Sequence, residues 1–119
     1  MLTIQTIENE ILAHLNSIAT GGDPTLRYGQ LATRLGARNH LRGSQSILNG
    51  IRHKYQTAKP RPLPDITWIL KSKATGYPSQ IHDKIIRRRS ELTEQDRKNA
   101  RIGLQEVIDA FCPGAHNPY

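Results

Sequence analysis

The sequence contains a single cysteine, Cys112, among 119 residues. One cysteine excludes an internal disulfide and every zinc site built on a CxxC pair, and it favours a reducing compartment. We therefore expect a cytoplasmic protein in which Cys112 is a core residue at the end of a helix.

Long hydrophobic runs are also missing. Glu8 and Glu10 interrupt the apolar N-terminal segment, which predicts neither a signal peptide nor a membrane span. Aromatic residues make up only 5%, so we expect a core of isoleucine and leucine. This length predicts one domain over residues 1–119: an N-terminal helix (1–20), a central core (25–78), and a basic segment with a C-terminal helix (79–119).

Acidic residues are absent from residues 24–64. The basic side chains of that stretch are Arg27, Arg34, Arg38, Arg42, Arg52, Lys54, Lys59 and Arg61. They give it a formal charge of +8, against +7 for the whole chain. Solvated helix faces normally mix both signs, so this imbalance favours an anionic partner, most commonly nucleic acid.

The first segment has the periodicity of an amphipathic helix over residues 3–19, with Thr3 as its cap. Its apolar stripe consists of Ile4, Ile7, Ile11, Leu15 and Ile18. We expect this stripe to pack on the rest of the domain. The alternative is a two-helix seam that makes a homodimer in place of a monomer.

Two further helices are predicted on either side of a glycine turn. The first covers residues 28–35 and is closed by Gly36, and the second covers residues 39–56. This order is typical of a helix-turn-helix, whose second helix can enter the major groove. The side chains predicted to project from it toward bases and phosphates are Arg38, Arg42, Gln45, Asn49, Arg52 and His53.

The segment KPRPLPD then predicts an extended connector that leads into a strand at residues 66–70. Ala74, Thr75 and Gly76 are expected at the tip of a hairpin, with Lys71 and Lys73 beside it. A hairpin after a helix-turn-helix indicates a winged helix whose lysines contact phosphates. The predicted fold class is therefore mainly α with a small β-hairpin, a winged helix-turn-helix flanked by an N-terminal and a C-terminal helix.

The last segment predicts a helix that begins at Thr93 and ends before Pro113. Three consecutive arginines precede it, Arg87, Arg88 and Arg89, and they are the most concentrated positive charge in the chain. We expect them to lie along phosphates beside the wing or to bind an acidic partner.

Several short motifs occur together in residues 26–76: RYGQLA at residues 27–32, Leu35-Gly36, and Arg42 with Leu48 on the second helix. With the proline-rich link and the glycine turn, this half of the chain resembles the C-terminal winged-helix domain of the O6-alkylguanine DNA alkyltransferases and alkyltransferase-like proteins. The resemblance implies that Tyr28 contacts the target phosphate and that Arg42 fills the space left by a flipped base.

One departure from that family concerns its chemistry. The family's reactive segment is Pro-Cys-His-Arg, whereas the matching place here reads Pro64-Asp65-Ile66-Thr67. Without the thiolate and its histidine, alkyl transfer is excluded. The five histidines of the chain show no metal-ligand spacing, so we predict no metal site and no cofactor.

The sequence thus favours a non-enzymatic protein that binds nucleic acid, with duplex DNA as the expected partner and no membrane involved. Two alternatives stay open. One is a protein-interaction module or inhibitor, of the kind a phage or mobile element encodes, which uses the basic surface on an acidic protein. The other is a small basic nuclease toxin that uses His40 or His53.

Overall fold

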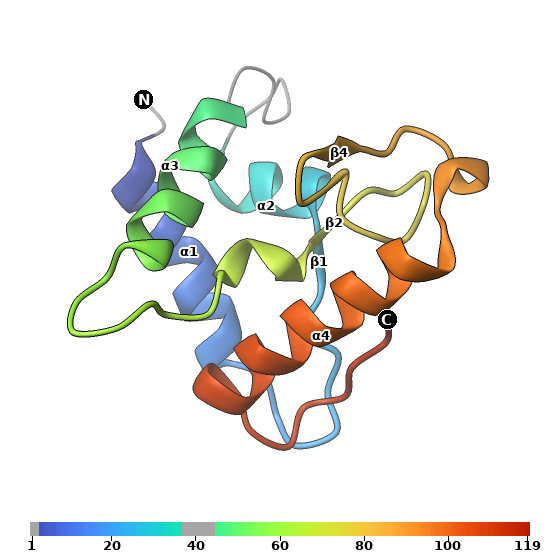
Figure 1. Cartoon of the computed structure of the whole chain (residues 1–119). Coiled ribbons are helices and arrows are strands. Elements are labelled where there is room, and N and C mark those ends of the chain that lie inside the picture. Colours follow the sequence, from blue (N-terminus) through green and yellow to red (C-terminus); the bar gives the residue numbers. More distant parts are fainter. Residues whose placement is uncertain (1–2, 37–44) are drawn as a thin grey trace.

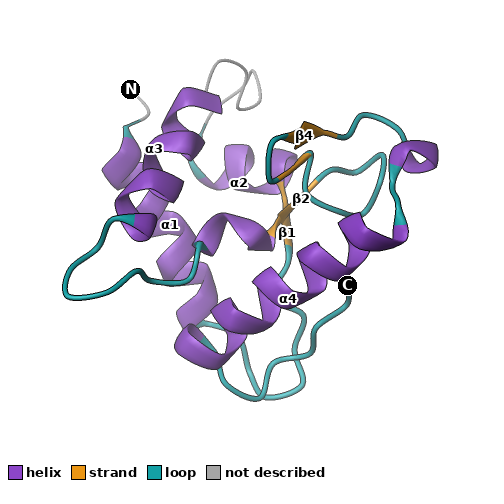
Figure 2. Cartoon of the chain, viewed as in Figure 1, coloured by secondary structure: helices purple, strands orange, loops and turns teal. Residues whose placement is uncertain are grey.

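A computed structural model describes residues 3–36 and 45–119 of the chain. Helices make up most of these residues (Figures 1 and 2). Arg38, His40 and Arg42 lie outside these described residues. In chain order the elements are α1 (Ile4–Asn16), β1 (Leu26–Arg27), α2 (Tyr28–Arg34), α3 (Gln45–Gln56), the 3-10 helix η1 (Ile66–Ile69), β2 (Leu70–Lys71), β3 (Gln80–Ile81), β4 (Lys84–Ile85), the 3-10 helix η2 (Arg89–Glu91) and α4 (Glu94–Phe111). The protein is therefore mainly α with little sheet, as the sequence predicts.

The first helix forms as expected and buries its stripe inside the chain. Thr3 Oγ1 accepts a hydrogen bond from the Thr6 amide at 3.1 Å and so caps the helix, which ends at Asn16, three residues before the expected end. Ile7, Ile11 and Leu15 are buried, whereas Ile4 is 40% exposed. Most of the apolar residues of this stripe therefore pack against the core of the same chain.

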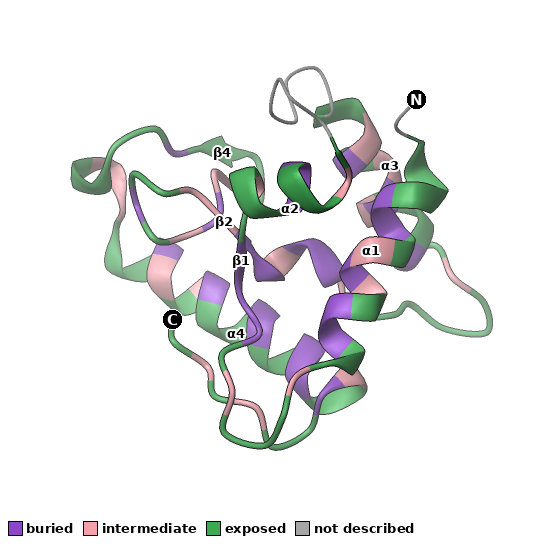
Figure 3. Cartoon of the chain, turned by 180° about the vertical axis from the view of Figure 1, so that it is seen from behind, coloured by how far each residue is buried: buried purple, intermediate pink, exposed green. Residues whose placement is uncertain are grey.

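The main core surrounds η1. Ile66, Ile69 and Leu70 are fully buried and pack against the inward faces of α1, α3 and α4. Figure 3 shows η1 and one side of both α1 and α4 in the colour of buried residues. A smaller cluster of Ile81, Ile86 and Ala100 lies beyond Trp68, which packs against both.

The prediction of a strand at residues 66–70 is wrong over most of its length, because residues 66–69 form a 3-10 helix. The 3-10 helix forms because of Asp65, whose Oδ1 accepts hydrogen bonds from the Thr67 amide at 2.9 Å and the Thr67 hydroxyl at 2.6 Å. This cap turns the backbone into a helical turn despite the β-branched composition. Only Leu70–Lys71 is extended, and it pairs in parallel with Leu26–Arg27.

The hairpin also lies later in the chain than expected. Ala74, Thr75 and Gly76 do form a turn, closed by a hydrogen bond from the Ser72 amide to the Tyr77 carbonyl at 2.8 Å, but no ladder of strands flanks it. The antiparallel pair is β3 with β4, joined by His82 and Asp83. His82 has a φ of 53°, the left-handed conformation that this tight connection requires.

The last helix begins and ends as predicted. Thr93 caps α4 by accepting a hydrogen bond from the Asp96 amide at 3.1 Å. Lys84 reaches Asp96 at 2.7 Å, which lowers the pKa of that carboxyl and joins β4 to the start of α4. The hairpin and the last helix are therefore fixed to each other.

A buried histidine joins α1 to α2. Pro24 O lies 2.9 Å from His14 Nε2, and Arg34 Nη1 lies 2.8 Å from His14 Nδ1. Since the guanidinium can only donate, Nδ1 accepts and Nε2 carries the proton. Burial lowers the pKa of His14, and the charge of Arg34 opposes protonation as well.

The position of His14 predicts a loss of stability in mild acid. The unfolded chain takes up a proton near pH 6.5, whereas folded His14 resists it, so the free energy of unfolding falls as pH drops below about 6.5. Urea unfolding at neutral pH and in mild acid measures this loss. In His14→Gln, which cannot titrate, we expect a smaller loss. An equal loss in both proteins would contradict this role.

Candidate nucleic-acid interface

Helix α3 has a buried face and a polar face. Leu48, Ile51 and Tyr55 are buried against the main core, as their helical spacing predicts. On the rest of the helix, Gln45, Asn49 and His53 are exposed and Arg52 is half-buried. Four of the six side chains predicted for this helix are thus accessible, and the remaining two, Arg38 and Arg42, are the ones outside the described residues.

Arg52 connects three elements. Its Nε donates to Thr67 Oγ1 at 3.0 Å and lies 3.5 Å from Asp65 Oδ2. Its Nη1 donates to Asn49 Oδ1 and to Gln80 Oε1, both at 3.0 Å. The guanidinium therefore holds α3 against η1 and β3, a function that the sequence pattern does not reveal.

Gln80 is a residue of this surface that sequence reasoning missed. Gln45 Nε2 donates to Gln80 Oε1 at 2.6 Å, and Gln80 Nε2 donates to the His82 carbonyl at 3.1 Å. These contacts place the hairpin beside α3, 35 residues apart in sequence. No local signal marks Gln80, since the contact exists only in the tertiary structure. We call Gln45, Asn49, Arg52 and Gln80 the α3–hairpin face.

A cavity of about 480 Å³ opens next to this face, between α3, η1 and the hairpin. Its lining residues are Asn49, Arg52, Gln56, Leu63, Asp65, Thr67, Trp68, Pro78, Gln80, His82 and Asp83. Asp65 and Thr67 of this lining belong to the N-terminal cap of η1. Thr67 is 2% exposed, and its hydroxyl donates to Asp65 Oδ1, so these two polar groups of the lining are bonded to each other.

Four basic side chains lie on the side of the hairpin that faces away from α3. They are Lys73, Arg87, Arg88 and Arg89, and we call them the basic cluster. Lys73 lies in the exposed turn before Tyr77, and Arg89 Nη1 donates to the Thr75 carbonyl of that turn at 3.3 Å. Arg87 and Arg88 are exposed and come one residue after β4, behind the buried Ile86. In Figures 1 and 3 the hairpin lies between α3 and η2.

Among the described residues, no side chain of the basic cluster forms an ion pair. Across residues 3–36 and 45–119 the ion pairs are Arg52–Asp65, Lys54–Glu8, Lys71–Asp23 and Lys84–Asp96. Glu91 accepts the backbone N–H groups of Arg88 and Arg87, which lowers the pKa of its carboxyl. Lys71 differs from Lys73, because it is half-buried in β2 with its ammonium 3.9 Å from Asp23.

Tyr28 fixes the start of α2 to the start of the hairpin. Its hydroxyl oxygen accepts hydrogen bonds from the Ser79 amide at 3.3 Å and the Ser79 hydroxyl at 3.1 Å. The oxygen accepts in both bonds, which leaves the phenolic proton available to an acceptor such as a phosphate.

The capping role of Asp65 gives a stability prediction. Asp65→Ala removes the cap of η1 and the carboxylate beside Arg52, so we expect it to lower the free energy of unfolding by about 1–2 kcal/mol. Urea unfolding measures the change. Asp83→Ala removes a carboxylate from the same cavity at an exposed position, and it should change stability by less than about 0.5 kcal/mol. Equal effects would contradict the assignment.

Comparisons with known proteins return no family model, no curated protein and no solved structure that matches this chain. Within the described ranges, no helix has the length and hydropathy of a membrane span. The same part of the chain contains no group of three or more His, Cys, Asp or Glu side chains placed to hold a metal ion.

Proposed function

We propose that this protein binds duplex DNA without catalysing a reaction, in the manner of a winged helix-turn-helix. In this proposal α2 and α3 are the two helices of the motif and the β3–β4 hairpin acts as the wing. The α3–hairpin face lies toward the bases, and the basic cluster contacts phosphates.

The observation that carries the proposal is the unpaired basic cluster beside a polar helix face. In the described residues Lys54, Lys71 and Lys84 each have an acidic partner, whereas Lys73, Arg87 and Arg88 have none. Other described basic side chains also lack an ion pair, such as Lys59 and Arg61, but those of the basic cluster gather beside the hairpin. Exposed charges of one sign that remain unneutralised attract polyanions and release counterions from them.

Duplex DNA suits the shape of this surface better than duplex RNA does. An α-helix fits the wide major groove of B-form DNA, whereas the major groove of A-form RNA is too narrow to admit one. The resemblance of residues 26–76 to the alkyltransferase winged-helix domain favours the same ligand.

Binding to a fluorescently labelled duplex of mixed sequence tests the proposal. We expect saturable binding at low salt, competition by unlabelled duplex DNA, and weaker competition by duplex RNA of the same length. Polyglutamate serves as the control for charge alone and should compete poorly at equal charge. If polyglutamate displaces the duplex as well as DNA does, the surface binds acidic chains in general, and the protein-interaction alternative replaces this proposal.

A further inference from the structure

On the α3–hairpin face the amide nitrogen of Asn49 and the amide oxygen of Gln45 are unused within the described part of the chain, besides Nη2 of Arg52. Gln45 gives its amide N–H to Gln80, and Asn49 Oδ1 accepts from Arg52. Over the described residues Gln45 Oε1 and Asn49 Nδ2 have no hydrogen-bond partner. Gln45 and Asn49 are four residues apart on α3, both are exposed, and their side chains are neighbours, with Gln45 Nε2 3.5 Å from Asn49 Oδ1.

Arg52 holds these amides in fixed orientations. Its Nε and both hydrogens of Nη1 are used on Thr67, Asn49 and Gln80. A bidentate contact with guanine needs a free pair of guanidinium donors, and only Nη2 remains. The geometry therefore makes Arg52 a positioning residue for Asn49 and Gln80 and leaves base contact to the amides.

We propose that Gln45 and Asn49 read adenine in the major groove, so that the protein prefers duplex DNA rich in A·T pairs. This inference rests on the proposed function. Asn49 Nδ2 donates to adenine N7, and Gln45 Oε1 accepts from the adenine N6 amino group.

The match to adenine follows from the base edges. Adenine presents one acceptor, N7, and one donor, N6, in the major groove, whereas guanine presents two acceptors and cytosine one donor. The unused Asn49 donor and Gln45 acceptor together complement adenine alone among single bases. In a G·C pair the acceptors lie on guanine and the single donor on cytosine, so the two neighbouring amides could not both bond to the edge of one base.

The test compares three duplexes of equal length and charge by fluorescence anisotropy. The first alternates A and T, the second alternates G and C, and the third replaces every adenine of the first by 7-deazaadenine, which lacks the N7 acceptor. We expect the A/T duplex to bind about tenfold more tightly than the G/C duplex. The 7-deazaadenine duplex should bind like the G/C duplex, since only the major-groove edge has changed.

Three variants then assign the residues. Asn49→Ala should bring the affinity ratio between A/T and G/C duplexes close to one, and Gln56→Ala, an exposed amide on the same helix, should leave the ratio unchanged. Arg52→Lys keeps the charge but loses the planar guanidinium that orients the amides, so it should lower the ratio. Circular dichroism confirms that each variant is folded.

The outcomes separate the two proposals. Binding to neither duplex would overturn the proposed function and this inference with it. Equal, salt-sensitive binding to both duplexes would overturn only the reading of adenine. A preference for the G/C duplex would also overturn the reading of adenine, because it indicates contacts with guanine. Equal binding to the A/T duplex and the 7-deazaadenine duplex would overturn it too, because it indicates contacts that do not involve adenine N7.

Discussion

Replacing Arg87 and Arg88 together by glutamate should weaken binding to duplex DNA on the order of 100-fold at low salt. The double variant removes two phosphate contacts and introduces two repulsive charges in their place. Both side chains are exposed and their contacts with Glu91 involve only the backbone, so the fold should persist. Anisotropy titration measures the affinity, and thermal unfolding checks that the variant is folded.

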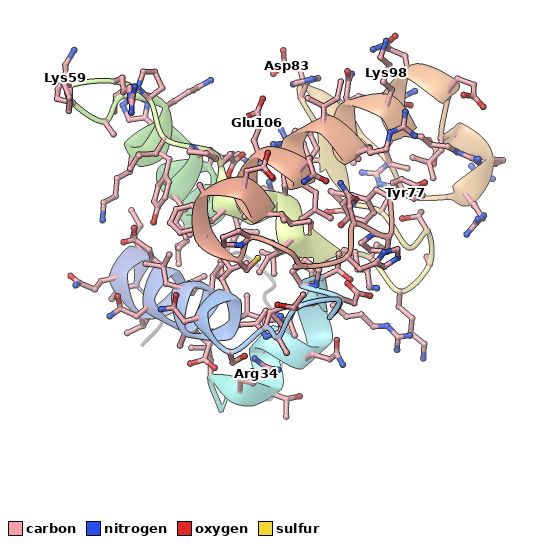
Figure 4. All side chains as sticks on the ribbon, turned by 90° about the horizontal axis from the view of Figure 1, so that it is seen from below. Arg34, Lys59, Tyr77, Asp83, Lys98 and Glu106 are labelled. Carbon is pink, nitrogen blue, oxygen red and sulfur yellow. The ribbon has the colours of Figure 1, made fainter. Side chains whose placement is uncertain are left out.

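The matched control makes the same change of charge elsewhere. Lys59→Glu with Arg61→Glu alters the net charge by the same amount in the loop between α3 and η1, and both positions are exposed. Figure 4 shows Lys59 at the end of this loop, pointing away from the rest of the chain. This control should lose only a few-fold in affinity through the long-range field. Equal losses in the two double variants would mean that net charge, and not the basic cluster, drives binding.

Gly103→Ala should destabilise the fold even though alanine is the better helix former. A Cβ at Gly103, in the middle of α4, would overlap the indole of Trp68 well inside van der Waals contact. Overpacking of this kind costs about 1–3 kcal/mol, more than the gain of about 1 kcal/mol from helix propensity. Because Trp68 is the single tryptophan of the chain, its fluorescence reports the displacement directly, while urea unfolding gives the loss of stability.

The control for this substitution is Gly29→Ala in α2. A Cβ there meets nothing within 4 Å, so the variant should be neutral or more stable by up to about 1 kcal/mol. Since Trp68 lines the cavity beside α3, Gly103→Ala should also alter that cavity. A Gly103→Ala protein with unchanged stability and tryptophan emission would contradict the packing described for α4 and η1.

The helices of this protein are predictable because their signals are local. Thr3 and Thr93 each cap the helix that follows through a side-chain oxygen. Buried residues at steps of three and four then mark the inward face of α1 and α4. The end of α2 is equally local, since Gly36 adopts a φ of 70° just after it.

The sheet was harder to predict because its determinants compete or lie far apart. The run at residues 66–70 has the composition of a strand, but one carboxylate, Asp65, bends it into a 3-10 turn. The true hairpin turns at His82 and Asp83, and His82 occupies a positive φ without the glycine or asparagine that normally marks such a turn. Its position is fixed by contacts across the fold, such as Gln45 with Gln80.

The residues that α3 contributes to the candidate site were predictable, but Gln80 and the contacts of Arg52 were not. Helical spacing correctly places Gln45, Asn49 and Arg52 on the polar side of α3. Arg52 bonds to Thr67 and Gln80 only because η1 and the hairpin pack against α3. Periodicity within one segment carries no information about such contacts.

The central claim is that the basic cluster neutralises phosphates of duplex DNA, and the salt dependence of binding tests it most directly. The slope of log K against log salt should be about −3 or steeper, since each phosphate contact contributes roughly −0.9 and the cluster offers four basic side chains. Neutralising two of them, with Arg87→Gln and Arg88→Gln, should make the slope shallower by roughly 2. A slope near zero, or one that this double variant leaves unchanged, would contradict the claim.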